Sequence, residues 1–295
     1  MFSRFVYALS VKIQKISLII SDDVYLKIVY WIKLRENLNL KFPKLFTEKI
    51  QWLKINERTN LHTKLADKYE VREYVENMIG SEYLIPLVSV FETPGEIDVS
   101  TLPSQFAMKG THGSGMNFIV FDRDEFDFES SLKVINTWFS YNFYSRTREW
   151  QYKNIKPRIV VEKLLLDKSG MVPSDIKVHC FRGKNGRLEY IIQVDLDRFG
   201  SHRQGYYSPD WQPLDLEFSS DSFQVSNALD FPKPQKLQDV LKLAEKLSRP
   251  FSYCRVDFFI CNDDIYFGEV TFHHHSGLTQ LSGNWNEKLG ELISL

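Results

Sequence analysis

The chain has 295 residues, of which 43% are hydrophobic and 14% aromatic, and its 37 basic and 38 acidic side chains leave a formal charge of −1. This composition excludes global disorder, because the chain can bury a substantial core. The even charge balance argues against a protein that binds nucleic acid through a broad basic face. The three cysteines, Cys180, Cys254 and Cys261, lack the close pairing of a zinc site and are typical of reduced core thiols in a cytoplasmic protein.

Residues 1–20 predict an amphipathic helix. Lysines interrupt its apolar run, so the segment lacks the long uncharged stretch of a membrane span and the cleavage site of a secretion signal. Its apolar residues recur at helical spacing: Phe5, Leu9, Ile13 and Ile16. The helix either docks on the rest of the chain or lies on a membrane surface or a partner, with three basic residues on its polar side: Arg4, Lys12 and Lys15.

Hydrophobic periodicity then predicts further helices and strands. Helices are expected over 22–37, 46–58, 65–80, 130–150 (in two pieces) and 236–251. Strands are expected over 106–109, 117–121, 157–166, 175–183 and 188–197, followed by a hairpin over 253–272. An Asn-Gly turn joins the strands 175–183 and 188–197, and residues 201–233 are expected to form a loop. Hairpins combined with separate helices indicate an α+β fold rather than a doubly wound parallel sheet.

A glycine-rich segment, Lys109-Gly110-Thr111-His112-Gly113-Ser114-Gly115, lies between two expected strands. Its three glycines let the backbone turn N–H groups toward a phosphate, and Lys109 can add a positive charge. The segment is not a P-loop, because the lysine precedes the glycines and no helix follows directly. An ordinary glycine-rich hairpin turn is the alternative interpretation.

Two carboxylates, Asp257 and Glu269, interrupt the apolar strands of the last hairpin. Buried carboxylates need a partner, and two that converge favour Mg²⁺. Because their residue numbers add to an even sum, an odd-length loop around Asp263 places them opposite each other, whereas a two-residue loop places them on opposite faces. Arg255 shares the face of Asp257. The alternatives are carboxylates that face solvent or a salt bridge with Arg255.

The run His273-His274-His275 suggests a zinc site, but consecutive side chains of a strand point in opposite directions and rarely converge on one metal. A histidine of this run that lines a phosphate or substrate pocket is the better hypothesis. The sequence has no Gly-x-Ser-x-Gly segment, which argues against a serine hydrolase.

Together these segments resemble the TupA-like branch of the ATP-grasp superfamily, named for teichuronopeptide biosynthesis. The resemblance extends from about Leu38 to Leu289 and rests on ordered blocks: FTEKIQWLK, LADKYEVREYV, LPSQFAMKGTHGSG, QYKNIKPRIVVEKLL, DIKVHCFRGK and RVDFF…IYFGEVTF…SG. It implies an α+β ATP-grasp fold in which two α+β lobes grip ATP. The implied segments are an N-terminal helical extension (1–36), an N-terminal lobe (37–107), a central subdomain with a Gly-rich lid (108–166) and a C-terminal lobe with a metal site (167–295).

The resemblance also implies roles for individual residues. It assigns the ATP phosphates to Lys68 and Lys109 and to a lid formed by Gly110, Thr111, His112, Gly113, Ser114 and Gly115. It assigns the adenine to the hinge Glu162, Lys163, Leu164 and Leu165, and the ribose hydroxyls to Asp175, with Lys177 beside it. It assigns Mg²⁺ to Asp257, Glu269 and Thr271, and catalysis at the acyl phosphate to Arg255 with Lys109. Thr271 replaces the Asn of many ATP-grasp enzymes, and His273–Ser276 replace a common Pro-Gly.

The implied activity is an ATP-dependent carboxylate–amine ligase with ATP and Mg²⁺ as cofactors. Its substrates would be an acid, such as a hexuronic acid, and an amino acid or amino sugar, in capsular or exopolysaccharide biosynthesis. We expect no nucleic-acid partner and a cytoplasmic location, with residues 1–20 in contact with the inner membrane face or a biosynthetic complex. The alternatives are a glycosyltransferase that uses a nucleotide sugar, with Asp195-Leu196-Asp197 as its metal motif, a non-catalytic scaffold, and a kinase that stops at phosphoryl transfer.

Overall fold

The computed structural model describes residues 19–196, 203–219, 226–227 and 231–295. The predicted helix over residues 1–20 therefore lies almost wholly outside the described residues. The chain forms two compact units that interleave along the sequence. Unit 1 contains residues 19–38, Lys54–Val71 and Pro86–Leu164, and unit 2 contains Asn39–Leu53, Arg72–Ile85 and Leu165–Leu295. Among the described residues, no helix has the length and apolar character needed to cross a bilayer.

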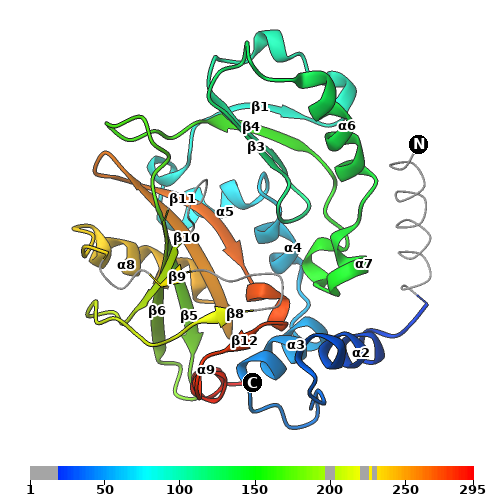
Figure 1. Cartoon of the computed structure of the whole chain (residues 1–295), viewed down its shortest axis with the longest axis vertical. Helices are drawn as coiled ribbons and strands as arrows, with labels where there is room; N and C mark the ends of the chain where they lie inside the picture. The colour runs from blue at the N-terminus through cyan, green and yellow to red at the C-terminus, as the bar shows by residue number, and fades with distance from the viewer. Residues whose placement is uncertain (1–18, 197–202, 220–225, 228–230) are drawn as a thin grey trace. The chain divides into compact units, whose positions relative to one another are not determined.

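Unit 1 is built on a four-stranded antiparallel sheet in the order β1-β4-β2-β3. The strands are β1 (Leu87–Phe91), β2 (Phe106–Gly110), β3 (Asn117–Val120) and β4 (Ile159–Lys163). The helices are α2 (Asp22–Leu34), α4 (Asn60–Ala66), α6 (Phe128–Phe139) and α7 (Phe143–Thr147), with short 3-10 turns at Pro94–Glu96, Val99–Thr101 and Trp150–Tyr152 (Figure 1). The predicted division of residues 130–150 into two helices is confirmed.

Strand alternation gives the unit 1 sheet one apolar and one polar face. Phe106 and Met108 of β2 pack with Ile135 and Trp138 of α6 in the core of the unit. Because successive side chains of a strand point to opposite faces, Lys109 lies on the other face. Glu162 shares that face, since it pairs across the sheet with Ala107. The packing of the apolar face thus brings Lys109 and Glu162 together.

Unit 2 contains a six-stranded sheet in the order β11-β10-β5-β6-β7-β9, antiparallel except for the β7–β9 pair. Its strands are β5 (Asp175–Arg182), β6 (Leu188–Leu196), β7 (Arg203–Tyr207), β9 (Ser226–Asn227), β10 (Tyr253–Cys261) and β11 (Asp264–Thr271). The short strands β8 (Phe218–Ser219) and β12 (Gln280–Leu281) form a separate pair. The helices are α5 (Val71–Ile79), α8 (Leu237–Ser248) and α9 (Trp285–Leu292), together with α3 (Phe46–Asn56) as far as Leu53.

The two faces of the unit 2 sheet differ in character. Ile176, Val178, Val256 and Phe258 form an apolar face, and α8 packs against β5 and β10 with its buried leucines (Figure 1). On the other face, the end of the sheet near Phe181 is apolar and packs with α3 and α9. Farther along the same face, the residues become charged. They are Asp175, Lys177, Asp195, Arg255, Asp257 and Glu269.

The hairpin of β10 and β11 brings Asp257 and Glu269 opposite each other by an unexpected route. The predicted pairing is confirmed, but the predicted odd-length loop is wrong. The turn has two residues, Asn262 and Asp263, whose φ angles of 52° and 72° suit a tight turn with left-handed residues. A β-bulge at Gly268 then inserts one residue and shifts the register back, so both carboxylates face the same side.

Two other predicted elements differ from the structure. The single helix expected over 65–80 is divided into α4 and α5, because Asp67 accepts hydrogen bonds from the backbone N–H groups of Tyr69 (2.8 Å) and Glu70 (3.4 Å) and so starts a new helix. The loop expected over 201–233 contains strands β7, β8 and β9. Its polar composition concealed β7, which pairs with β6 over Arg203–Tyr207.

Candidate functional site

The polar face of the unit 1 sheet carries an ion pair between two of the predicted ATP-binding residues. The Nζ of Lys109 lies 2.6 Å from Oε2 of Glu162, and their side chains are 20% and 10% exposed. Of the other hinge residues, Lys163 donates its backbone N–H to the carbonyl of Pro86 (2.9 Å), and Leu164 and Leu165 are buried. The division between the two units falls between Leu164 and Leu165, which is where a hinge is predicted.

The glycine-rich loop is held at both ends. Gly110 N–H donates to the carbonyl of Met116 (2.8 Å), and Thr111 N–H donates to the carbonyl of Arg158 (3.0 Å). Within the loop, Lys68 donates from Nζ to the carbonyl of Gly113 (2.6 Å). Both predicted phosphate-binding lysines, Lys68 and Lys109, therefore belong to unit 1, one against the loop and one on the strand before it.

His112 anchors the middle of this loop. The residue is only 3% exposed, and its Nε2 lies 2.8 Å from the carbonyl oxygen of Trp138. Burial lowers the pKa of His112, so its imidazole is neutral at pH 7. Ser114 and Gly115, in contrast, are exposed, and Gly115 has a φ of 73°. The accessible tip of the loop is thus the Ser114-Gly115 pair.

Arg255 is the centre of the polar face in unit 2. Its guanidinium binds Asp257 through two parallel hydrogen bonds, Nε to Oδ1 (2.6 Å) and Nη2 to Oδ2 (2.7 Å). The same Nη2 atom donates to Oε1 of Glu269 (3.0 Å) and to Oγ1 of Thr271 (3.1 Å). Each of the three predicted Mg²⁺ ligands therefore has an oxygen within hydrogen-bond distance of the same cationic nitrogen, Nη2 of Arg255.

The ionisation of Arg255 and Asp257 reflects their burial. Burial by itself would lower the pKa of Arg255, but the carboxylate of Asp257 outweighs this effect and raises the pKa, so the guanidinium stays charged. Burial raises the pKa of Asp257 to about 6, while Arg255 and Lys177 oppose that rise. Asp257 is therefore still ionised in most molecules at pH 7.

The three oxygen-bearing side chains beside Arg255 have the chemistry that the predicted Mg²⁺ site requires. Asp257, Glu269 and Thr271 offer hard oxygen atoms from adjacent strands, and Mg²⁺ is usually held by one or two carboxylates together with substrate phosphates. No group of three or more His, Cys, Asp or Glu residues suited to a metal ion occurs in the described part of the chain. The two carboxylates and the hydroxyl are therefore oxygen donors of the kind that Mg²⁺ takes, in a number that would leave coordination positions for phosphate oxygens.

A second set of polar residues lies on β5 and β6. Lys177 forms an ion pair with Asp195, and Lys177 also pairs across the sheet with Asp257. Asp195 accepts a further hydrogen bond from Nε2 of Gln193 (3.0 Å). Asp175 is buried opposite Asp195. Asp195 is thus bound by Lys177 and Gln193, and Asp197, its partner in the predicted glycosyltransferase motif, lies outside the described residues.

His179 and His274 are site residues that the sequence did not single out individually. His274 accepts a hydrogen bond at Nδ1 from Nη1 of Arg255 (2.8 Å), so it holds the third nitrogen of the guanidinium. His179 lies between the hydroxyl of Tyr253 (2.9 Å) and Oε1 of Gln193 (3.0 Å), and its ring meets that of His274 edge-on at 4.7 Å. Strand alternation from Lys177 could have placed His179 on this face.

The histidines on this face are neutral at pH 7. Burial lowers the pKa of His179 to about 3 and that of His275 to about 4, and the positive charge of Arg255 acts in the same direction. Burial also lowers the pKa of His274 well below its ordinary value. A neutral His274 can accept a hydrogen bond from Arg255, which a protonated imidazole could not do.

A left-handed turn after β11 positions His274. His275, Ser276 and Gly277 have φ angles of 46°, 57° and 62°, a conformation that is costly for residues other than glycine. Gln51 stabilises this turn by donating from Nε2 to the carbonyls of Ser276 (2.8 Å) and Gly277 (2.9 Å). The histidine run thus leads into a tight turn. That one of its histidines lines a phosphate or substrate pocket stays a prediction.

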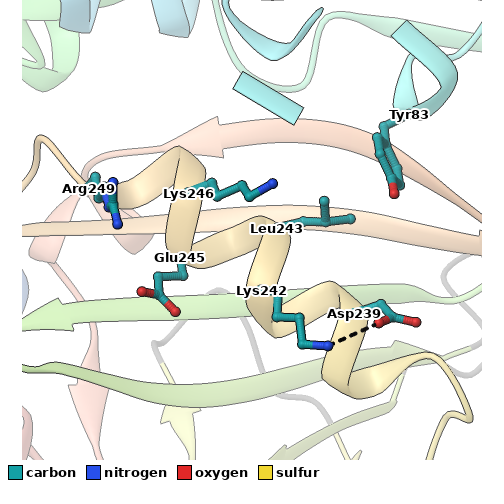
Figure 2. Close-up of a pocket in the computed structure, with 7 residues that line it drawn as sticks. All are labelled: Tyr83, Asp239, Lys242, Leu243, Glu245, Lys246 and Arg249. Atoms are coloured by element: carbon teal, nitrogen blue, oxygen red, sulfur yellow. Dashed lines mark ion pairs between the residues drawn. The ribbon is translucent and has the colours of Figure 1, made fainter. Parts of the chain in front are cut away.

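A hollow elsewhere on unit 2 does not coincide with these residues. It lies beside α8 and has a volume of about 400 Å³. Figure 2 shows the residues that line it, which are Tyr83 and residues on one side of α8 from Asp239 to the C-cap residue Arg249. Its charged groups are at the surface, and Lys242 pairs with Asp239 at 3.6 Å with 73% and 55% of their side chains exposed. None of the predicted site residues lines this hollow.

Several solved structures are similar to this chain. Similar solved structures include D-alanine–D-alanine ligase from Helicobacter pylori, with 14% identity and a TM-score of 0.45, covering 84% of this chain and 69% of that one. Phosphoribosylamine–glycine ligase from Thermotoga maritima has 10% identity and a TM-score of 0.39, and the match covers 71% of this chain and 48% of that one. N5-carboxyaminoimidazole ribonucleotide synthetase from Thermus thermophilus has 11% identity and a TM-score of 0.39, and the match covers 70% of this chain and 45% of that one. The chain spans less than two thirds of the last two proteins. Comparison with curated proteins gives no match.

The family model of TupA-like ATP-grasp proteins matches residues 48–294, which is most of the chain. The α+β architecture, with a four-stranded antiparallel sheet and a largely antiparallel six-stranded sheet, agrees with that fold. We conclude that this chain is an ATP-grasp enzyme and belongs to the TupA-like ATP-grasp family.

Proposed function

We propose that this enzyme is an ATP-dependent ligase that joins a carboxylate to an amine through an acyl phosphate. The observation that carries the proposal is the convergence of Asp257, Glu269 and Thr271 on one nitrogen of Arg255, in a chain that belongs to the TupA-like ATP-grasp family. Carboxylates and a guanidinium at one point suit the binding and stabilisation of a transferring phosphoryl group.

The reaction needs activation of the acid, because a carboxylate has a poor leaving group and does not react with an amine at neutral pH. Transfer of the γ-phosphoryl of ATP to the carboxylate oxygen forms an acyl phosphate and ADP. Attack of the amine on the acyl carbon then forms the amide and releases phosphate and a proton. In this proposal Arg255 stabilises the charge of the phosphoryl group, and Lys68 and Lys109, which lie at and beside the glycine-rich loop, supply charge for the phosphates of ATP.

A bound Mg²⁺ ion would neutralise phosphate charge, and Asp257, Glu269 and Thr271 are the residues that would hold it. The acid that we propose is a sugar acid such as a hexuronic acid, and the amine an amino acid or amino sugar, in the synthesis of a surface polysaccharide. Support for this substrate class comes from the TupA-like branch, which is named for teichuronopeptide biosynthesis.

Release of phosphate and ADP tests the proposal directly. The enzyme is incubated with ATP and Mg²⁺, and hexuronic acids, UDP-hexuronic acids and amino acids are added singly and in pairs. We expect phosphate only with a matched pair of acid and amine, together with an amide product of the expected mass. Formation of ADP with an acid alone, with the phosphate retained on the acid, would identify a kinase, and turnover of a nucleotide sugar without ATP would replace the proposal with a glycosyltransferase.

A further inference from the structure

Helix α2 (Asp22–Leu34) has apolar residues on two sides, and only one side is buried. The buried residues are Leu26, Tyr30 and Leu34. Four large apolar residues are 44%, 47%, 52% and 50% exposed: Val24, Ile28, Trp31 and Ile32. Their spacing places them on one face of the helix, and we call them the α2 stripe. A surface helix normally presents polar residues on its outer side, so a contiguous apolar stripe there indicates a binding surface.

The α2 stripe is presented by a helix that unit 1 holds firmly. Asp22 accepts a hydrogen bond at Oδ1 from the hydroxyl of Tyr144 (2.8 Å) and pairs at Oδ2 with Arg58 (2.5 Å). Tyr25 donates from its hydroxyl to the carbonyl of Arg146 (2.8 Å). The helix is therefore fixed by its polar and buried sides, and its remaining side faces outward as a preformed apolar surface.

Basic side chains outnumber acidic ones in α2 and the sequence before it, by six to three over residues 1–36. The guanidinium of Arg35 lies over the ring of Trp31, 5.2 Å from its centroid. Of the three acids, Asp22 is bound by Arg58, Asp23 pairs with Lys27 at 3.9 Å, and Glu36 is exposed beside Arg35. In the sequence, residues 1–18 lead directly into this helix and contain Arg4, Lys12 and Lys15 but no Asp or Glu.

We propose that the α2 stripe docks on the surface of an anionic phospholipid bilayer. Aliphatic residues with a tryptophan and flanking basic side chains suit the boundary between acyl chains and headgroups, where apolar burial and attraction to anionic lipid act together. A second copy of the chain is a poorer occupant. Four side chains are far fewer than the roughly 20 residues per partner that a stable protein interface buries. This proposal is independent of the ligase activity.

Vesicle sedimentation tests the proposal with the full chain. Wild-type protein is mixed with vesicles of phosphatidylcholine alone or of phosphatidylcholine with phosphatidylglycerol. The double variant Ile28→Gln/Trp31→Gln removes apolar surface without changing charge. The matched control, Val134→Gln/Phe121→Gln, replaces residues of unit 1 that are 43% and 49% exposed on other elements. Circular dichroism checks that every protein is folded.

We expect binding to the anionic vesicles that falls by about tenfold in the stripe variant and is unchanged in the control. Equal binding of wild type and stripe variant would overturn the proposal, because basic residues alone would then suffice. Two other results would also overturn it. Absence of wild-type binding together with a lower melting temperature of the stripe variant would show that part of the same chain covers the stripe. A wild-type dimer that the variant converts to a monomer would show that a second copy does so.

Discussion

At the scale of single residues, Arg255 is the group on which most of the polar face in unit 2 depends. It makes five hydrogen bonds, of which two go to Asp257 and the others to Glu269, Thr271 and His274. These partners together engage all three guanidinium nitrogens, so the group is held before any substrate arrives. Such preorganisation is what makes a cation effective in stabilising a transferring phosphoryl group.

Glu269 should be needed for activity but not for folding. Its side chain is 40% exposed, whereas Asp257 is 3% exposed and forms two hydrogen bonds with Arg255. We expect Glu269→Gln to lower kcat by about a hundredfold with little change in melting temperature. Phosphate release and thermal unfolding measure the two effects.

As a control, Asp257→Asn should lose both activity and stability, because it weakens a buried pair. Full activity of Glu269→Gln would show that this carboxylate has no role in the reaction.

His274 should act by positioning Arg255. The variant His274→Phe removes the acceptor at Nδ1 and leaves one guanidinium nitrogen unpaired in a buried place, which costs roughly 1.5–3 kcal/mol for a charged group. We expect kcat to fall by about tenfold or more while the KM for ATP stays constant. His274→Asn places an oxygen near the former Nδ1 and should restore much of the activity. Equal loss in both variants, or a rise in KM alone, would contradict a positioning role.

At the scale of elements, short local devices set the geometry of both halves of the predicted site. The bulge at Gly268 returns Glu269 to the face of Asp257 after a two-residue turn. Asp67 ends one helix and caps the next, and Lys68 follows it with its side chain directed to the loop at Gly113. In each case one residue redirects the chain, and the chemically important residue lies beside it.

The left-handed turn after β11 predicts a stability difference between two glycines. Gly277 has a φ of 62°, and a Cβ atom there would lie 2.7 Å from Nε2 of Gln51 and from Cγ2 of Ile50. Gly283 has a φ of 52°, and a Cβ atom there would meet nothing within 4 Å. We expect Gly283→Ala to cost about 1 kcal/mol from backbone strain alone. Gly277→Ala should cost clearly more, because atoms of α3 must move.

Urea unfolding of the two glycine variants measures the difference. If both variants lose the same stability, the contact with α3 is unimportant and only the left-handed backbone matters. Because the turn carries His274, we also expect Gly277→Ala to lower turnover, whereas Gly283→Ala should retain it.

At the scale of the whole molecule, the buried histidines make stability depend on pH. His179 has a pKa of about 3 in the folded chain and about 6.5 when unfolded. Between these values only the unfolded state binds the proton, so the free energy of unfolding rises with pH, by about 1.4 kcal/mol per pH unit for this residue. The contribution is complete above about pH 6.5 and is lost as pH falls toward 3. His275 acts in the same sense down to about pH 4.

Groups near His179 modify this dependence. Asp257, with a pKa raised to about 6, contributes with the opposite sign between its unfolded pKa near 4 and pH 6, and Arg255 stays positive throughout. The variant His179→Gln should therefore show a shallower loss of stability between about pH 6 and 4, while wild type and variant keep parallel curves above pH 7. Urea titrations across this range measure the slopes, and identical slopes would show that His179 takes up a proton in the folded state.

Much of the fold follows from local patterns in the sequence. Alternating and helical periodicities predicted α6, α7 and α8 as well as the hairpins of β5 with β6 and of β10 with β11, because these elements bury one regular face. The helix expected over 65–80 failed because the side chain of Asp67 competes for backbone N–H groups, an interaction that periodicity does not detect. Strand β7 was missed because its stability comes from pairing with β6 rather than from its own composition.

By itself the sequence determined the α+β class, the position of the glycine-rich loop at Lys109–Gly115, the hairpin that carries Asp257 and Glu269, and the resemblance to ATP-grasp proteins, because these depend on residue types and their order. Only the tertiary structure decided that Gly268 corrects that register, that Asp195 binds Lys177, and that His179 and His274 lie with Arg255 on one face. These contacts join residues far apart in sequence, so packing of the sheet, and not local pattern, brings them together.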